Sequence, residues 1–347
     1  MKILTIVIPT FNRSKLLTKT LDSLSSQINT KIQNQVEVVI SDNASPDNTG
    51  DKVKDWIDNN SQIDAAYFRN PENLGFDRNF LLGAEGARGQ FIWFMSDDDF
   101  LAEGAVEKIV HVLEHNTDIT FAFVNYSMLT PGFEEYFPYK YGENIKLAPD
   151  EFFIRSEVGF SFVSSCIFKR EVFIGLDLEK YIGSFWIHLY AAKDAAIQGV
   201  CLIIAEPLLK MVRPGLHESR SERKDSSRTI EAFMDFHLSF LDYIDSFCCS
   251  SYSKDTVKFL KNLGWGLNFN QIVSFKLTSE TYRYIEIKEI FLRMRKYFNN
   301  KYLFWFVHVP FLISPKFISA VYFYVKLKKI KLKLLLKPSF ISLGLIK

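Results

Sequence analysis

Three consecutive carboxylates, Asp97, Asp98 and Asp99, follow directly after an apolar run at residues 90–96. Adjacent carboxylates repel one another, and a divalent cation relieves that repulsion because hard Mg²⁺ or Mn²⁺ prefers oxygen ligands. Such a cation can also neutralise a diphosphate as the bond to it breaks. The triplet therefore predicts metal-assisted chemistry on a phosphate-containing substrate. The alternative is that these residues cap the helix expected from Gly104 or line a solvated turn.

The elements around the triplet alternate between strand and helix. Apolar, β-branched runs predict strands at residues 3–9, 36–41, 65–69 and 90–96. Helical patterns follow them at residues 14–27, 51–59, 77–87 and 104–114, with Ser14 as the expected N-cap of the first. Further strand-like pieces stand at 119–126, 162–168 and 200–205, and helical patterns at 230–247 and 253–272. This order predicts an α/β fold with a mostly parallel, Rossmann-like sheet flanked by helices.

Polar clusters stand at the C-terminal ends of three of these strands. Residues 10–13 follow the first strand, residues 42–45 the second, and the acidic triplet the fourth. Ligands of open parallel sheets bind beyond the C-terminal strand ends, so we expect one shared site there. Asp42 also has a structural interpretation, because SDNASPDNT is typical of Asx turns. The chain lacks a G-x-G-x-x-G motif after the first strand and a P-loop lysine motif, which disfavours dinucleotide binding and ATP hydrolysis.

Four motifs carry a resemblance to a known family. VIPTFNR, VVISDNASPDNT, NPENLGFDRNF and GQFIWFMSDDDFL resemble, in this order, the signature series of the inverting family 2 glycosyltransferases. The resemblance covers residues 1–115, and the NLGFDRNF and SDDD variants are most similar to the abequosyltransferase-type enzymes that decorate bacterial O-antigens. It implies the GT-A fold, Mn²⁺ or Mg²⁺ as cofactor, and hexosyl or deoxyhexosyl transfer from a nucleotide diphosphate sugar to a hydroxyl of a lipid-linked bacterial surface glycan.

The resemblance also implies roles for individual residues. Donor-binding positions are Pro9, Thr10, Arg13, Asp42, Arg78, Asp97 and Asp98, and the metal ligands are Asp99 and Asp97. Asp97 would hold the ribose or the donor sugar. Ser96 stands where relatives often carry a further Asp, which changes the division of labour within the triplet.

The group that accepts the proton of the attacking hydroxyl is expected in the second half of the chain. Many relatives use the Asp of a Glu-Asp pair before a helix-ending glycine, and counting back eleven residues from Gly199 places His188 there. Histidine can act as this base because its usual pKa is about 6.5. The alternative is a core histidine beside Trp186. Asp194 is the fallback candidate, six residues further along the expected helix.

Three regions are predicted. Residues 1–115 form the donor half, residues 116–228 the acceptor half with a mobile loop at 213–228, and residues 229–347 a helical, basic and aromatic extension. Arg213, His217 and Arg220 resemble the segment that relatives fold over the diphosphate, and an ordinary solvated loop is the alternative. Two other functions compete: a sugar nucleotidyltransferase, whose glycine-rich loop is missing, and a non-catalytic relative that binds nucleotide sugar or membrane.

Charge is segregated along the chain. Residues 290–347 carry twelve Lys or Arg and no Asp or Glu, whereas the first 289 residues carry 30 basic and 40 acidic side chains. Lysines interleaved with aromatic residues suit an acidic membrane surface. The alternative is a subdomain that packs on the body or on another subunit of an oligomer. Nothing in the donor half supports nucleic-acid binding.

The expected compartment follows from cysteine usage and from the terminal residues. The four cysteines show neither metal-ligand spacing nor a disulfide framework, which favours a reducing cytoplasm. The N-terminal apolar run is too short for a signal sequence, and no segment reaches the roughly 18 apolar residues of a membrane span. We expect a cytoplasmic protein with peripheral contact to the inner face of the cell membrane.

Overall fold

A computed structural model describes residues 2–129, 137–140, 142–156, 159–212 and 239–262. The chain divides into two compact units, Met1–Asp225 with Asp242–Lys261, and Ser226–Leu241 with Asn262–Lys347. All the strands and helices named below belong to the first unit. The helix expected at residues 253–272 lies partly outside the described residues, as does the first half of the one expected at 230–247. The basic tail lies wholly outside them.

Four parallel strands make up one side of the central sheet. They are β1 (Leu4–Thr10), β2 (Val36–Asp42), β3 (Ala65–Arg69) and β4 (Phe91–Phe94), in the spatial order β3-β2-β1-β4. Both β1 and β2 are apolar and almost fully buried, as strands covered on both faces must be. The register sets Thr10 opposite Asp42 and Asp42 opposite Arg69. The polar residues at the carboxyl ends of these strands are therefore brought side by side.

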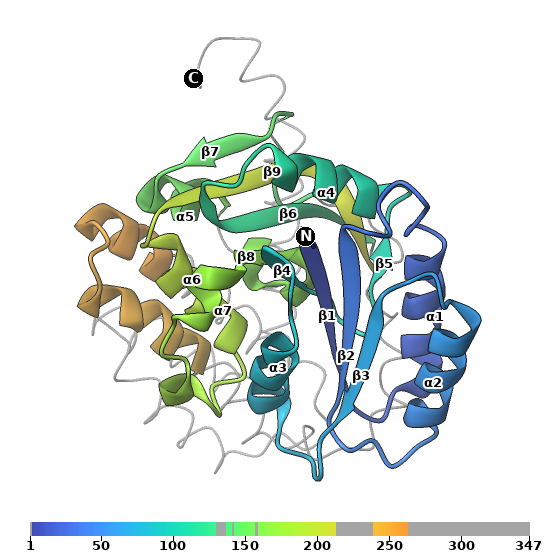
Figure 1. The fold of residues 1–347 in the computed structure, drawn as a ribbon. Coiled ribbons are helices and arrows are strands. Elements are labelled where there is room, and N and C mark those ends of the chain that lie inside the picture. Colours follow the sequence, from blue (N-terminus) through green and yellow to red (C-terminus); the bar gives the residue numbers. More distant parts are fainter. Residues whose placement is uncertain (1, 130–136, 141, 157–158, 213–238, 263–347) are drawn as a thin grey trace, which may run out of the picture. The chain divides into compact units, whose positions relative to one another are not determined.

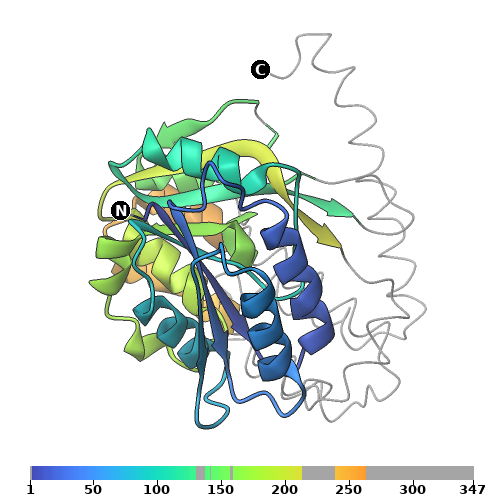
Figure 2. The same cartoon turned by 45° about the vertical axis from the view of Figure 1, so that its right-hand side comes forward.

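Helices cover both faces of this half (Figure 1). Helices α1 (Ser14–Ser25) and α2 (Thr49–Asn59) pack against each other on one face, and α4 (Ala105–Glu114) lies on the same side. Helix α3 (Phe76–Glu85) packs on β1 and β2 from the other face. Figure 2 separates α1 and α2 clearly from α3. The alternating strands and helices predicted for residues 3–114 are all present.

The start of α1 differs from the expectation by one residue. Arg13, not Ser14, is the N-cap, and its side chain makes no capping hydrogen bond. The backbone N–H of Ser14 instead donates to Asp47 Oδ2 at 3.0 Å. A carboxylate suits the positive end of the helix dipole, so Asp47 replaces the expected local cap from a distant loop.

The other half of the sheet mixes strand directions. Strand β8 (Cys166–Lys169) pairs antiparallel with both β4 and β6 (Ile119–Leu129), and two short 3₁₀ turns directly precede it. Strand β9 (Val200–Val212) runs parallel to β6 and antiparallel to β5 (Phe100–Leu101) and β7 (Ile145–Leu147). The sheet is thus parallel around the predicted site and mixed beyond β4.

Aromatic side chains fill the layer between the sheet and α3. Phe80 of α3 stacks on Phe94 of β4 with ring centroids 3.5 Å apart. Phe173 of α6 (Arg170–Ile174) contacts Phe94 and Phe168 at 5.3 and 5.1 Å. Helix α7 (Ile187–Ala196) completes this layer on β6 and β8. This cluster fixes α3, α6 and α7 relative to the end of β4.

Residues 242–261 pack against the same unit. Tyr243 lies edge-on to Tyr190 of α7, and Phe247 and Tyr252 pack on Phe153 of α5 (Pro149–Ser156).

None of the helices in the described ranges combines the length and the apolar character that a bilayer crossing requires.

Candidate active site

The acidic triplet lies at the carboxyl edge of the sheet and contacts the cluster that follows β1. Asp97 accepts hydrogen bonds from Thr10 Oγ1 at 2.7 Å and from Arg13 Nη1 at 2.9 Å. The same Arg13 nitrogen lies 3.1 Å from Asp98 Oδ2. The structure therefore brings together Thr10, Arg13 and the triplet, as the strand order predicted.

Arg13 balances only part of the negative charge. Burial raises the pKa of Asp97, while the cation of Arg13 and the hydroxyl of Thr10 oppose that rise. Asp98 is more exposed and also accepts from Ser96 Oγ at 2.6 Å. One guanidinium thus faces two carboxylates directly, and the third carboxylate is left to other partners.

Asp99 is the most poorly compensated member of the triplet. It is buried, and its Oδ2 accepts a hydrogen bond from Ser164 Oγ at 2.5 Å. Burial, together with the charges of Asp98 and Asp97, raises the pKa of Asp99 to about 7, against the opposing effects of Ser164 and Arg13. Without a cation, much of Asp99 is protonated near neutral pH.

Ser164 is a site residue that sequence reasoning missed. It lies in the 3₁₀ turn Val163–Ser165 just before β8, and its Oγ also accepts from the backbone N–H of Ser96 at 2.8 Å. It therefore fixes both Asp99 and the chain leading into the triplet. No motif marks this serine, because its role depends on the pairing of β8 with β4.

The donor set of the triplet fits a hard divalent cation through one main ligand. Both carboxylate oxygens of Asp97 are engaged, whereas the second oxygen of Asp99 accepts no hydrogen bond from the described residues. Within those residues, no three or more His, Cys, Asp or Glu side chains are arranged to hold a metal by themselves. Mg²⁺ and Mn²⁺ commonly take one or two carboxylates and complete their shell with phosphate and water. Asp99 suits that role, and Asp97 would have to exchange a present partner to join it.

We expect Ser164→Ala to weaken cation binding most at low pH. The hydroxyl lowers the pKa of Asp99, so its loss raises that pKa and favours the protonated form that cannot bind metal. A hydrogen bond to a charged group contributes about 1.5–3 kcal/mol, so Mn²⁺-dependent nucleotide affinity at pH 6 should fall roughly tenfold. Calorimetric titration at pH 6 and pH 8 checks this, and an equal loss at both pH values would contradict it.

Asp42 lies at the centre of a second polar cluster. Its Oδ1 accepts from the backbone N–H of Ser45 at 2.9 Å, and its Oδ2 accepts from Tyr67 Oη at 2.7 Å and Arg69 Nη1 at 2.9 Å. The turn-forming interpretation of Asp42 therefore describes its local geometry. Tyr67 and Arg69 were not predicted from the sequence. They form the more exposed, polar side of this cluster.

The other donor candidates lie at the same edge. Pro9 is part-buried in β1, opposite Ser41 of β2. Arg78 lies in the first turn of α3 and forms an ion pair with Glu179. Asn43, at the end of β2, donates to the carbonyl of Gly75 directly before α3, which ties these two segments together.

His188 lies in the first turn of α7, where its sequence spacing placed it, but it is only 2% exposed. Its Nε2 is 3.1 Å from the carbonyl oxygen of Ser161, and because a carbonyl only accepts, Nε2 must carry the hydrogen. The rings of Phe76, Phe80 and Trp186 surround the imidazole at 6.5, 6.5 and 5.9 Å. Burial lowers the pKa of His188 to about 4, so the ring is neutral at pH 7 and a weaker base than an ordinary histidine. Its catalytic role stays a prediction.

Asp194 and the three loop candidates are not among the side chains that the structure brings together at this edge. Asp194 is six residues from His188, roughly 9 Å along the helix axis, and accepts from Tyr181 Oη at 3.1 Å. The loop candidates Arg213, His217 and Arg220 lie outside the described residues.

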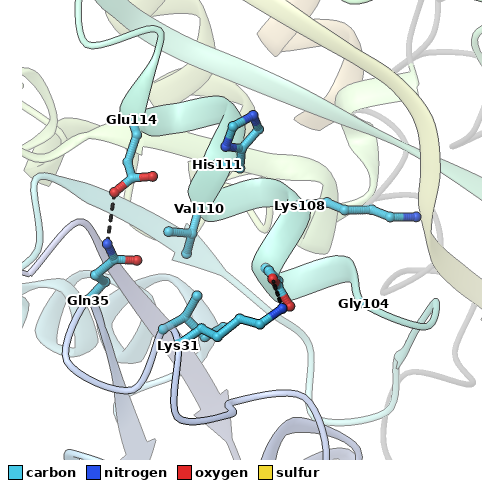
Figure 3. A pocket seen from close by; sticks show the side chains of 9 residues that line it. Lys31, Gln35, Gly104, Lys108, Val110, His111 and Glu114 are labelled. Carbon is cyan, nitrogen blue, oxygen red and sulfur yellow. Dashed lines mark hydrogen bonds and ion pairs between the residues drawn. The ribbon is translucent and has the colours of Figure 1, made fainter.

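A separate pocket of about 530 Å³ opens between α4 and the segment that precedes β2 (Figure 3). Lys31 binds Glu107 at 3.1 Å, and Gln35 donates to Glu114 at 2.8 Å, so these lining groups are paired with one another. Gln35 directly precedes β2, which places the pocket at the amino end of that strand. It therefore lies away from the carboxyl edge, and we assign it no part in the chemistry.

Known proteins resemble this chain in sequence and fold. Residues 5–176 match the family described as Glycosyl transferase family 2. The abequosyltransferase RfbV of Salmonella typhimurium is 30% identical over 262 residues, which cover 72% of this chain and 75% of that protein. A GalNAc(5)-diNAcBac-PP-undecaprenol beta-1,3-glucosyltransferase of Campylobacter jejuni is 32% identical over 108 residues, covering 31% of this chain and 33% of that protein.

The comparison with solved structures agrees with these sequence matches. The structure of S. aureus TarS residues 1–349 in complex with UDP-GlcNAc superposes with a TM-score of 0.64 and 16% identity, covering 86% of this chain and 80% of that one. The fold is thus that of the GT-A glycosyltransferases, as predicted. The chain belongs to glycosyltransferase family 2 and is a glycosyltransferase.

Proposed function

We propose that the protein is an inverting, metal-dependent glycosyltransferase that moves a hexosyl or deoxyhexosyl group from a nucleotide diphosphate sugar to a hydroxyl of a bacterial surface glycan. The observation that carries this proposal is the convergence of Thr10, Arg13 and the triplet at the carboxyl edge, with Asp99 left short of positive charge. A divalent cation that binds together with a diphosphate supplies that positive charge.

Each side chain at the edge has a role in donor binding under this proposal. Pro9, Thr10, Arg13, Asp42, Arg78, Asp97 and Asp98 line the donor, and Asp99 is the main metal ligand, with Asp97 as the second. The cation, when bound, neutralises charge that develops on the leaving diphosphate. Arg13 already binds Asp97 and Asp98, so it holds these carboxylates in place for the donor.

The acceptor side is proposed from the relatives and the residue spacing. The name of the Campylobacter relative includes an undecaprenyl diphosphate glycan, and this supports a lipid-linked acceptor here. Inversion needs a base on the face opposite the leaving group. The spacing of the sequence makes His188 the candidate for this base, with Asp194 as fallback. The resemblance to the family suggests that Arg213, His217 and Arg220 belong to a segment that covers the diphosphate.

Membrane contact is proposed for the basic tail. Residues 290–347 combine twelve cationic side chains with aromatic ones, which suits an anionic inner leaflet and a cytoplasmic enzyme that meets its lipid-linked acceptor there. Contact of the tail with another subunit is the alternative. Removal of the chain after Phe298 should release the protein from anionic vesicles if the membrane proposal holds.

We expect the donor site to reveal itself in a binding panel. UDP-, GDP-, CDP- and dTDP-sugars would be titrated calorimetrically with and without Mn²⁺, and at least one should bind at least tenfold more tightly with the ion. Asp99→Ala should remove that dependence on Mn²⁺. Failure of every nucleotide sugar to bind, or binding unaffected by both the ion and the substitution, would overturn the proposal.

A further inference from the structure

Asp77, in the first turn of α3, reaches across to the segment that leads into α7. Its Oδ2 accepts the backbone N–H groups of Gly183 at 2.8 Å and Phe185 at 3.0 Å. Both residues have positive φ, +88° and +64°, a conformation that a non-glycine residue such as Phe185 adopts only at a cost. One carboxylate oxygen thus holds the strained turn that starts α7.

The other oxygen of Asp77 is without a partner. Oδ1 is buried and accepts no hydrogen bond from any described residue, in a side chain that is 5% exposed. A buried, unsatisfied acceptor costs about 1–3 kcal/mol, so its presence in a folded protein needs a reason. Burial raises the pKa of Asp77, although the backbone donors of residues 183–187 oppose this. Burial favours the protonated form of Asp77, and the oxygen without a hydrogen-bond donor, Oδ1, is the one that can carry the proton.

The neighbours of Asp77 on α3 contact both β4 and α7. One turn further along α3, Phe80 stacks on Phe94, three residues before Asp97. The ring of Phe76, next to Asp77, lies edge-on to His188 at 6.5 Å. The carboxylate therefore occupies the same corner as the first turn of α7, where the spacing of the sequence places the base.

Burial makes His188 a weak base. Its pKa of about 4 is that of an ordinary carboxyl group, whereas the pKa of Asp77 lies above the ordinary value for aspartate. A general base works best when its pKa approaches the operating pH. Asp77 brings a carboxylate from α3 to the start of α7, whose own first turn has no acidic residue.

We propose that Asp77 is the general base of the transfer and that its Oδ1 takes the proton of the acceptor hydroxyl. This inference rests on the proposed function. The O–H bond breaks towards Oδ1 while the hydroxyl oxygen forms its new bond to the anomeric carbon. The bond from that carbon to the diphosphate breaks, and its electron pair leaves with the diphosphate.

The approach to Asp77 suits a sugar acceptor. Phe76, its neighbour in sequence, is 40% exposed, and Phe185, whose N–H it binds, is 50% exposed. Large exposed aromatic side chains beside a polar group are typical of ligand-binding surfaces. A pyranose ring can lay its apolar face on either phenyl ring, next to Asp77, whose Oδ1 itself is covered by protein atoms.

The decisive variant is Asp77→Asn in the full chain. The amide oxygen can still accept from Gly183 and Phe185, so the turn is kept, but the NH₂ group in place of Oδ1 cannot take a proton. The kcat for transfer to a panel of octyl glycosides, followed as nucleoside diphosphate release, should fall about 10²–10⁴-fold. Donor affinity and Tm should stay near those of the unmodified protein. Formate should partly restore turnover in Asp77→Ala.

Asp118→Asn is the matched control, because it makes the same chemical change at an exposed position outside the site. We expect this variant to retain transfer within about tenfold. If Asp77→Asn turns over normally, or if His188→Gln loses the activity in its place, Asp77 is not the base. If the unmodified protein binds no nucleotide sugar and transfers to no glycoside, the proposed function falls and takes this inference with it.

Discussion

Asp99→Asn should abolish most transfer while making the metal-free protein more stable. The amide keeps an oxygen for Ser164 but loses the charge that binds the cation. A metal ion contributes several kcal/mol to stabilising the transition state, and about 1.4 kcal/mol corresponds to a factor of ten. We therefore expect kcat/KM to fall about 10³-fold, measured as nucleoside diphosphate release at saturating Mn²⁺.

The gain in stability follows from the pKa of the same group. In the folded, metal-free protein the pKa of Asp99 is about 7, above the ordinary value of 3.8, so folding favours the protonated form. The stability that this group contributes is complete below about pH 4 and is lost as the pH rises through 7. Because each pKa unit corresponds to about 1.4 kcal/mol, Asn at this position should raise the free energy of unfolding at pH 8 by a few kcal/mol.

Urea unfolding in EDTA at pH 5 and pH 8 checks this sign. The advantage of Asp99→Asn should be largest at pH 8 and clearly smaller at pH 5, where the folded protein holds Asp99 mostly protonated. Asp118→Asn is a matched control, because Asp118 is exposed, pairs with Lys146 and lies outside the site. A loss of stability in Asp99→Asn at pH 8 would show that the buried carboxylate is better compensated than its contacts indicate.

Asp42→Asn should impair both folding stability and donor binding. The carboxylate accepts through both oxygens, from Ser45 on one side and from Tyr67 and Arg69 on the other. An amide has one acceptor oxygen, so its NH₂ group must face a donor. Leaving a buried polar group mismatched costs about 1–3 kcal/mol, and we expect the free energy of unfolding to fall by that amount.

The affinity for the nucleotide sugar should also fall in Asp42→Asn, because Arg69 is no longer held in position. The guanidinium is held by Asp42 and by the carbonyl of Ser45, and its release should weaken nucleotide sugar binding at least tenfold. Asp51→Asn makes the same chemical change at an exposed position in the first turn of α2 and should leave affinity unchanged. Normal affinity in Asp42→Asn would limit this residue to its turn.

The sequence predicted the parallel half of the fold well, because its features are local. Continuous apolar runs mark β1 to β4, and the acidic triplet follows β4 directly. The mixed half was harder. Strand β8 pairs antiparallel with β4 across 74 to 78 positions of sequence, and no turn signal specifies that pairing. Long-range pairing is decided by the packing of whole elements and not by a pattern within one of them.

The missed site residues share the same cause. Ser164 contacts Asp99 only because β8 returns beside β4, and Asp77 contacts residues 183 and 185 only because α3 and α7 share one face. For His188, the spacing indicated a helix that ends near Gly199, and α7 is that helix. Its surroundings come from Phe76 and Phe80 of another helix, so neither its burial nor its lowered pKa was visible in its own segment.

The register of the three strands at the donor edge limits where the chain can tolerate insertions. Thr10, Asp42 and Arg69 occupy matching positions on β1, β2 and β3. Side chains alternate between the faces of a strand, so one extra residue inside β2 would turn Asp42 to the opposite face and expose its buried neighbours. An extra residue in the connection at 26–35 would leave that alignment intact. Length changes that preserve the enzyme should therefore be confined to the connections at the amino ends of the strands.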